Sequence, residues 1–183
     1  MWQNKKSIKK EKLPVILTRE PGGSNTAEKI RKIILSNKSN FNEITDLLLY
    51  LASRSENVEK LIIKNYRKKI ILIDRFIDST LAYQHYGMGI NKKLIINLNK
   101  FILNKIKPDF TFLNIVDKNN LRLRLNKRAN KNRYDKFNLN FYNKVQKGYI
   151  KIARKKNNYL IINSNNTINY NKNLIIKKIT RLI

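Results

Sequence analysis

Two charged residues, Asp74 and Arg75, follow the most apolar strand that the sequence predicts. Residues 70–73 are Ile, Ile, Leu and Ile, an unbroken run typical of a buried parallel strand. Ligands of open α/β sheets bind beyond the carboxyl ends of the strands, so we expect Arg75 to face a crevice. A guanidinium group suits a phosphate at such a place, and a plain salt bridge between Asp74 and Arg75 is the alternative.

Polar side chains continue directly after this charge pair and predict a site for a polar ligand. Hydroxyl, amide and carboxyl groups follow at Asp78, Ser79, Thr80, Tyr83 and Gln84. Gly87 and Gly89 then permit a tight turn.

Two further arginines are expected at the same crevice. Arg19 follows a short apolar strand at 14–18, and Pro21 stops that strand. Arg54 lies four residues after Tyr50, so the two share a helix face. Tyr50 fits either the core or a platform for a base, whereas Arg54 beside apolar residues needs an anionic partner or an exit to water. Convergent arginines predict an anionic substrate, and a phosphate monoester fits them.

These residues require a parallel α/β sheet to bring them together. Strands are predicted at 14–18, 69–74, 108–116 and 159–163, and they alternate with helical patterns, which favours a parallel sheet flanked by helices in a single domain, 1–183. Asn25 with Glu28, Asn91 and Asp117 are predicted to cap helices. Further helices are expected at 45–68, 92–105, 118–128, 137–156 and 170–183.

Composition excludes several classes of site. The chain has no Cys and a single His, so disulfides, thiolate nucleophiles and histidine metal clusters cannot form. No apolar run is long enough to span a membrane and no secretory signal is visible, so we expect a reducing cytoplasm. The net charge of +28 suggests nucleic-acid binding. However, Lys, Asn and Ile are inflated together, which favours A/T-rich codon bias and leaves no specific nucleic acid as a predicted partner.

The sequence resembles the thymidylate kinase family in three motifs that occur in the family's order. The first is TREPGG at 18–23, the second is Tyr50 four residues before Arg54, and the third is DRFIDSTLAYQ at 74–84. The resemblance implies a P-loop-kinase-like fold of the nucleoside monophosphate kinase type. It also implies phosphoryl transfer from ATP to dTMP, giving dTDP for dTTP biosynthesis, with Mg²⁺ as cofactor and a homodimer as assembly.

The resemblance also assigns roles to residues. Arg54 and Arg75 would hold the 5′-phosphate of dTMP with Arg19 close by, and Tyr50 would stack on thymine. Asp74 would stand near Mg²⁺ and the reacting phosphates. Ser79, Thr80, Tyr83 and Gln84 would hydrogen-bond the base and sugar.

The basic loop 129–136 resembles the family's lid, although a solvated loop is the alternative. Arg128, Lys131 and Arg133 would close over ATP, and Asp135 stands where the family usually has Glu. The implied catalytic residues are therefore Asp74, Arg75 and Arg133.

One family block is missing from the printed sequence. No G-x-x-x-x-G-K-[ST] motif, the phosphate-binding loop of such kinases, occurs in it. Residues 1–12 are expected to be the remnant of the first helix or disordered, after a lost strand and loop of roughly 20–25 residues. A mis-assigned start and a decaying gene both explain the loss. We therefore expect impaired use of ATP, with a non-catalytic dTMP-binding remnant or a basic nucleic-acid-binding protein as alternatives.

Overall fold

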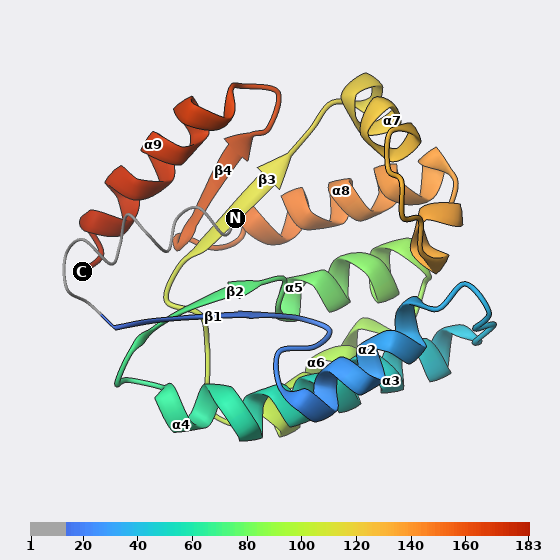
Figure 1. Cartoon of the computed structure of the whole chain (residues 1–183), viewed down its shortest axis with the longest axis horizontal. Coiled ribbons are helices and arrows are strands. Elements are labelled where there is room, and N and C mark those ends of the chain that lie inside the picture. The colour runs from blue at the N-terminus through green and yellow to red at the C-terminus, as the bar shows by residue number, and fades with distance from the viewer. Residues whose placement is uncertain (1–13) are drawn as a thin grey trace.

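The computed structural model describes residues 14–183, so the expected remnant at 1–12 lies outside the described residues. The first half of the described chain contains two strands, and the second half contains two more (Figure 1). The elements are β1 (Val15–Arg19), α2 (Asn25–Leu35), α3 (Glu43–Asn57), the π-helical η1 (Val58–Ile62), α4 (Ile63–Asn65), β2 (Ile70–Asp74), α5 (Ile77–Thr80), the π-helical η2 (Leu81–Gly87), α6 (Lys92–Leu103), β3 (Thr111–Ile115), α7 (Lys118–Asn126), the 3₁₀ turn η3 (Arg133–Lys136), α8 (Leu139–Ala153), β4 (Tyr159–Asn163) and α9 (Ile168–Thr180).

The four predicted strands are confirmed, and they form two parallel pairs. In the first pair, Val15 lies opposite Ile70 and Arg19 lies opposite Asp74. In the second pair, β3 and β4 align over their whole length. Within residues 14–183 the pairs are two separate two-stranded sheets; in Figure 1, α8 runs below β3 and β4, and α5 continues from the end of β2. The α/β class is confirmed.

The strand β2 is less buried than its sequence predicts. Residues 70–73 are half-buried, so the expectation of a fully buried strand is wrong. A parallel strand is buried when it has a neighbour on each side and helices on both faces. Within the described part of the chain, β2 pairs with β1 alone.

The helix signals are largely confirmed, with two corrections. Asn91 and Asp117 cap α6 and α7 as predicted, but Ser24 rather than Asn25 caps α2, because its hydroxyl accepts from the amide of Ala27. The predicted helix 45–68 is three consecutive segments, α3, η1 and α4. Its apolar start is not buried all round, since Leu48 is 52% exposed.

The sequence did not predict the helix that follows β2. Residues 77–87 form α5 and η2, and Gly87 ends this helix, whereas Gly89 at φ +87° makes the turn. A Cβ at Gly87 would lie 2.6 Å from the Phe141 ring of α8. Reciprocally, a Cβ at Gly148 of α8 would lie 2.5 Å from the Tyr86 ring. We call this contact the glycine seam; it lets η2 and α8 pack at close range.

The core joins the helices of the two halves. Its largest cluster of buried side chains comes from α3, η2, α6 and α8, and the loop between η2 and α6 adds Ile90. Among residues 14–183, no helix combines the length and apolar character that crossing a membrane requires. The buried members of the cluster are Leu47, Leu51, Leu81, Ile90, Ile95 and Ile152.

Candidate active site

The carboxyl ends of β1 and β2 bring charged residues together. Because the strands are parallel and in register, Arg19 lies opposite Asp74 and next to Arg75. Arg75 has φ +64°, in the left-handed region that residues other than glycine rarely adopt. Its guanidinium group lies 5.0 Å from the centre of the Tyr83 ring, and its Nη2 donates to the Tyr83 hydroxyl at 3.3 Å. The exposed side chain of Arg75 therefore extends towards Tyr83 on η2, in the helix that follows β2.

A second guanidinium group near this edge is held by a carboxylate. Arg19 binds Glu28 of α2 through two hydrogen bonds of 3.0 and 2.9 Å. The bond from Arg19, and then the amide of Gly23, lower the pKa of Glu28, although burial opposes them. One cation of the candidate site is therefore already neutralised.

Arg31 on α2 also belongs to this cluster, and the sequence analysis missed it. Its Nη1 donates to the carbonyl of Pro21 at 2.6 Å, and the side chain is half-buried. Burial first, and then the charge of Arg19, lower the pKa of Arg31, with a further contribution from Arg75. Because the positive charges of Arg19 and Arg75 disfavour the charged form of Arg31, an anion bound at this edge would be stabilised by all three groups. The sequence signal that could have identified Arg31 is its type, because it is an arginine in a predicted helix of a chain in which lysine is far more common.

Arg54 is placed in the interior. It is 1% exposed, its Nε donates to Glu20 at 2.6 Å, and its Nη1 binds the side-chain oxygen of Asn99. Burial raises the pKa of Glu20 even though Arg54 opposes it. Its guanidinium group also lies 5.5 Å from the ring of Phe76, the residue after Arg75. Arg54 is therefore close to the arginine cluster, but protein groups already engage its Nε and Nη1.

Tyrosine rings surround the predicted base and sugar residues. Tyr50 and Tyr83 each contact Tyr134 of η3 edge-on, with ring centres 6.0 Å apart. Burial raises the pKa of Tyr50 and of Tyr149 to about 12, so both hydroxyls stay protonated near neutral pH. Tyr149 donates to the Ser79 hydroxyl at 2.6 Å.

Two predicted ligand-binding side chains have buried polar atoms without a partner. The Oγ1 of Thr80 and the Oε1 of Gln84 are buried and make no hydrogen bond within the described chain. The Nε2 of Gln84 donates to Oδ2 of Asp46 at 3.0 Å. Asp46 is 1% exposed, and the sequence analysis gave it no role.

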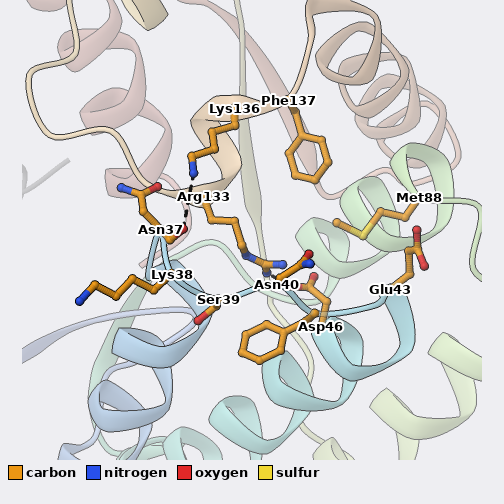
Figure 2. Close-up of a pocket in the computed structure, with 11 residues that line it drawn as sticks. Asn37, Lys38, Ser39, Asn40, Glu43, Asp46, Met88, Arg133, Lys136 and Phe137 are labelled. Carbon is orange, nitrogen blue, oxygen red and sulfur yellow. Dashed lines mark hydrogen bonds and ion pairs between the residues drawn. The ribbon is translucent and has the colours of Figure 1, made fainter.

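The expected lid is docked onto α2 and α3. Arg133 binds Asp46 and donates to the carbonyl of Ile34 at 3.2 Å, while Arg128 pairs with Asp135 at 2.7 Å. Lys131 is exposed, and its carbonyl accepts from Asn37. Figure 2 shows Arg133 pointing towards Asp46 in a cavity of about 490 Å³. This cavity is lined by residues 37–41, 43 and 46, by Met88, by Arg133 and Lys136 of the expected lid, and by Phe137.

The described residues hold no cluster of three or more acidic or histidine side chains that would enclose a metal ion. Mg²⁺ bound with a nucleotide does not need one, because it keeps water and phosphate oxygens as most of its ligands. The exposed Asp74 stands at the carboxyl end of β2, beside the arginines. A single carboxylate there fits a magnesium–nucleotide complex.

Parallel strands flanked by helices, with an arginine cluster at the carboxyl ends of β1 and β2, give the chain the P-loop-kinase-like fold of the nucleoside monophosphate kinase type. The family model described as thymidylate kinase matches residues 4–175. A crystal structure of thymidylate kinase from Ehrlichia chaffeensis superposes with a TM-score of 0.72 at 33% identity, covering 91% of this chain and 80% of that chain. The chain belongs to the thymidylate kinase family.

Curated relatives agree with this assignment. Thymidylate kinase of Wolbachia pipientis wMel is 46% identical over 143 residues, which are 78% of this chain and 70% of that protein. Thymidylate kinase of Acholeplasma laidlawii is 35% identical over 181 residues, 97% of this chain and 89% of the relative. The alignments with three Wolbachia relatives cover 65 to 70% of those proteins. The family's reaction, phosphoryl transfer from ATP to dTMP, is the activity that these relatives support.

Proposed function

We propose that this chain binds dTMP at the carboxyl ends of β1 and β2, as the acceptor of a phosphoryl group from ATP. The observation that carries the proposal is the cluster of Arg19, Arg31 and Arg75 beside the rings of three tyrosines, Tyr50, Tyr83 and Tyr149. Planar guanidinium groups bind phosphate oxygens in pairs, and aromatic rings contact a base. The site and a lid at 129–136 would belong to one catalytic domain.

Each predicted residue has a role in this proposal, but Arg31, which was not predicted, takes the place of Arg54 at the phosphate. Arg75 and Arg31 bind the 5′-phosphate, while Arg19 joins them by exchanging Glu28 for the ligand. Tyr50 contacts the base, and the group on α5 and η2, namely Ser79, Thr80, Tyr83 and Gln84, binds base and sugar. Arg54 acts from the interior, where its pair with Glu20 fixes the loop that follows Arg19.

On the donor side, the lid arginines and Asp74 would serve the transfer. Arg128, Lys131 and Arg133 would supply positive charge over ATP once the lid leaves Asp46, and Asp74 would hold Mg²⁺. Bound with ATP, Mg²⁺ bridges phosphate oxygens and neutralises charge in the transition state. Asp74 and Arg75 are adjacent, so the metal and the acceptor phosphate would meet at the end of β2.

We further propose that the printed chain uses ATP poorly. Its sequence contains no G-x-x-x-x-G-K-[ST], the motif whose backbone amides hold the ATP phosphates. The same observation favours a second candidate function, a dTMP-binding protein without catalysis.

Two measurements on residues 1–183 separate these functions. Titration calorimetry with dTMP at physiological salt is expected to show one saturable site that Arg75→Met weakens at least about tenfold, as loss of a charge-assisted phosphate contact predicts. Lys177→Met, on the remote α9, is the matched control for removing one positive charge. A coupled assay of ADP release then reports turnover. If the folded chain does not bind dTMP but binds duplex DNA with steep salt dependence, nucleic-acid binding becomes the proposed function in place of both candidates.

A homodimer in the cytoplasm is the assembly and location that we propose. Ile44 and Leu48 lie one turn apart on α3 and are 49% and 52% exposed. An apolar strip of this kind is typical of a surface that a partner covers. Leu48→Glu is expected to convert a dimer into a monomer in light scattering coupled to gel filtration, whereas Lys60→Glu on the exposed side of η1 would not. A monomeric wild-type chain would contradict the proposal.

A further inference from the structure

One buried carboxylate, Asp46, connects three elements of the candidate site. It lies in the first turn of α3 and is 1% exposed. Its oxygens accept from the amide of Gln84 at 3.0 Å and from the hydroxyl of Tyr134 at 2.7 and 2.6 Å. Arg133 forms an ion pair with it from the lid (Figure 2). The carboxylate therefore joins the lid to the helix that carries the predicted base contacts.

The chemistry of Asp46 determines which way the amide of Gln84 faces. An ionised carboxylate only accepts hydrogen bonds, so the NH₂ group of Gln84 must point to it. The amide oxygen then points away from Asp46. That oxygen is buried and has no partner within residues 14–183. A buried acceptor without a donor is costly, and such groups are normally satisfied.

A second unpartnered atom lies close to the first along the helix. Thr80 precedes Gln84 by four residues, is 1% exposed, and its hydroxyl oxygen is also without a partner in the described chain. Side chains four residues apart lie on neighbouring turns of one helix face. The two atoms together indicate a polar ligand whose edge offers a donor to Gln84.

We propose that Asp46 is a positioning residue that fixes Gln84 as a hydrogen-bond acceptor and so selects a pyrimidine with an N3–H donor. Thymine and uracil carry this N3–H, whereas N3 of cytosine is an acceptor and would face the amide oxygen unfavourably. The proposal rests on the proposed binding of a nucleoside monophosphate and specifies how that site reads the base. Asp46 acts through Gln84 and does not touch the substrate.

The lid contributes to this selection through the same carboxylate. Tyr134 and Arg133 both bind Asp46, and together they hold it against Gln84 from the side of the lid. Docking of η3 and orientation of the amide are thus parts of one network. While the lid is docked on Asp46, a ligand that reaches Gln84 therefore meets a base contact that the lid supports.

The test compares dissociation constants for dTMP and dCMP in the wild-type chain and in Asp46→Asn. The amide that replaces the carboxylate can donate or accept, so Gln84 is free to turn its NH₂ group towards the ligand. The preference for dTMP over dCMP is expected to fall at least about tenfold in this variant, mainly by tighter binding of dCMP. Asp109→Asn, the same exchange at an exposed position before β3, is the matched control and is expected to retain the wild-type preference within about twofold. Asp46→Glu is expected to restore part of it.

A substrate-free measurement makes the inference independent of the proposed function. In ¹⁵N-edited NMR, the side-chain NH₂ group of Gln84, assigned by its absence in Gln84→Met, is expected to exchange with solvent far more slowly than the NH₂ groups of exposed asparagines. Rapid exchange in the wild-type chain would overturn the inference, even if Asp46→Asn failed to fold. An unchanged dTMP preference in a folded Asp46→Asn chain would overturn it as well. If neither nucleotide binds but the NH₂ group is protected, the proposed function fails while the Asp46–Gln84 contact stands.

Discussion

The half of the molecule around β1 and β2 is held by buried polar contacts, whereas the half around β3 and β4 is more open. In the first half, Thr18 donates to Asn57 at 3.0 Å, and Arg54 binds both Glu20 and Asn99 in the interior. In the second half, α7 has no buried residue, and Ile168 at the start of α9 is 77% exposed. The comparison indicates that the first half positions the residues proposed to bind dTMP, whereas the second half contributes the proposed lid and supporting contacts.

The two halves are connected by side chains because their described strands do not pair. Asp78 on α5 accepts from Lys156 at 3.2 Å and from the hydroxyl of Tyr159 on β4. Tyr149 on α8 reaches Ser79, and the glycine seam brings α8 against η2. These contacts lie next to the predicted substrate residues, so the connection between the halves also supports the site.

Removing Arg54 should have the largest effect, because it breaks the buried network of the first half. Arg54→Met leaves Glu20, which is 3% exposed, without its cation. Loss of one partner from a buried ion pair costs about 3–5 kcal/mol of unfolding free energy, to be measured by urea denaturation. Arg19→Met, which opens an ion pair with a 42% exposed arginine side chain, is the matched control and should cost about 0–1 kcal/mol. If Arg54→Met and Arg19→Met lose the same unfolding free energy, the buried contacts of Arg54 stabilise the first half no more than the exposed Arg19–Glu28 pair does.

Removing Asp78 should have an intermediate effect, located in the second half. Asp78→Ala deletes the acceptor for Lys156 and Tyr159 and is expected to cost about 1–3 kcal/mol. Hydrogen exchange should accelerate at the amides of β4 and less at those of β1. Asp109→Ala, at an exposed position before β3, serves as the control. Uniform acceleration in all four strands would show that the halves unfold as one unit.

The smallest effect concerns the pH dependence of the Arg19–Glu28 pair. The pKa of Glu28 is lowered in the folded chain, chiefly by its bond from Arg19. A lowered carboxyl pKa contributes stability that is complete above the unfolded value of about 4.3 and is lost as the pH falls through the folded value. Glu28→Gln should therefore reduce the loss of unfolding free energy at acid pH by no more than about 1 kcal/mol, which is the range for exposed ion pairs. If the unfolding free energy of Glu28→Gln falls at acid pH as much as that of the wild-type chain, the Arg19–Glu28 pair does not contribute to the stability of the first half.

Local patterns in the sequence were sufficient to predict the strands and most helix ends. The apolar runs at β1 to β4 and the caps Asn91 and Asp117 depend on neighbours in sequence, and all were found. The helix α5–η2 was missed because its polar side chains and Gly87 resemble a turn. Packing against α8 determines its structure instead.

The site was predictable only where its residues follow strands. Arg19 and Arg75 could be placed at one edge, since parallel strands end together. Asp46, Arg31 and Tyr134 depend on contacts across the fold; the two bonds from Tyr134 to Asp46, for example, join residues 88 positions apart. The burial of Arg54 could not be foreseen either, because its partner Glu20 lies 34 residues away.

The glycine seam limits how the composition of this chain can change. Only five glycines remain among 183 residues, in a sequence enriched in Lys, Asn and Ile. Gly87 and Gly148 each face an aromatic ring so closely that even alanine would push η2 and α8 apart. Most surface positions can accept a larger side chain at little cost, whereas any substitution at Gly87 or Gly148 places a Cβ within 2.6 Å of an aromatic ring, which then has to move.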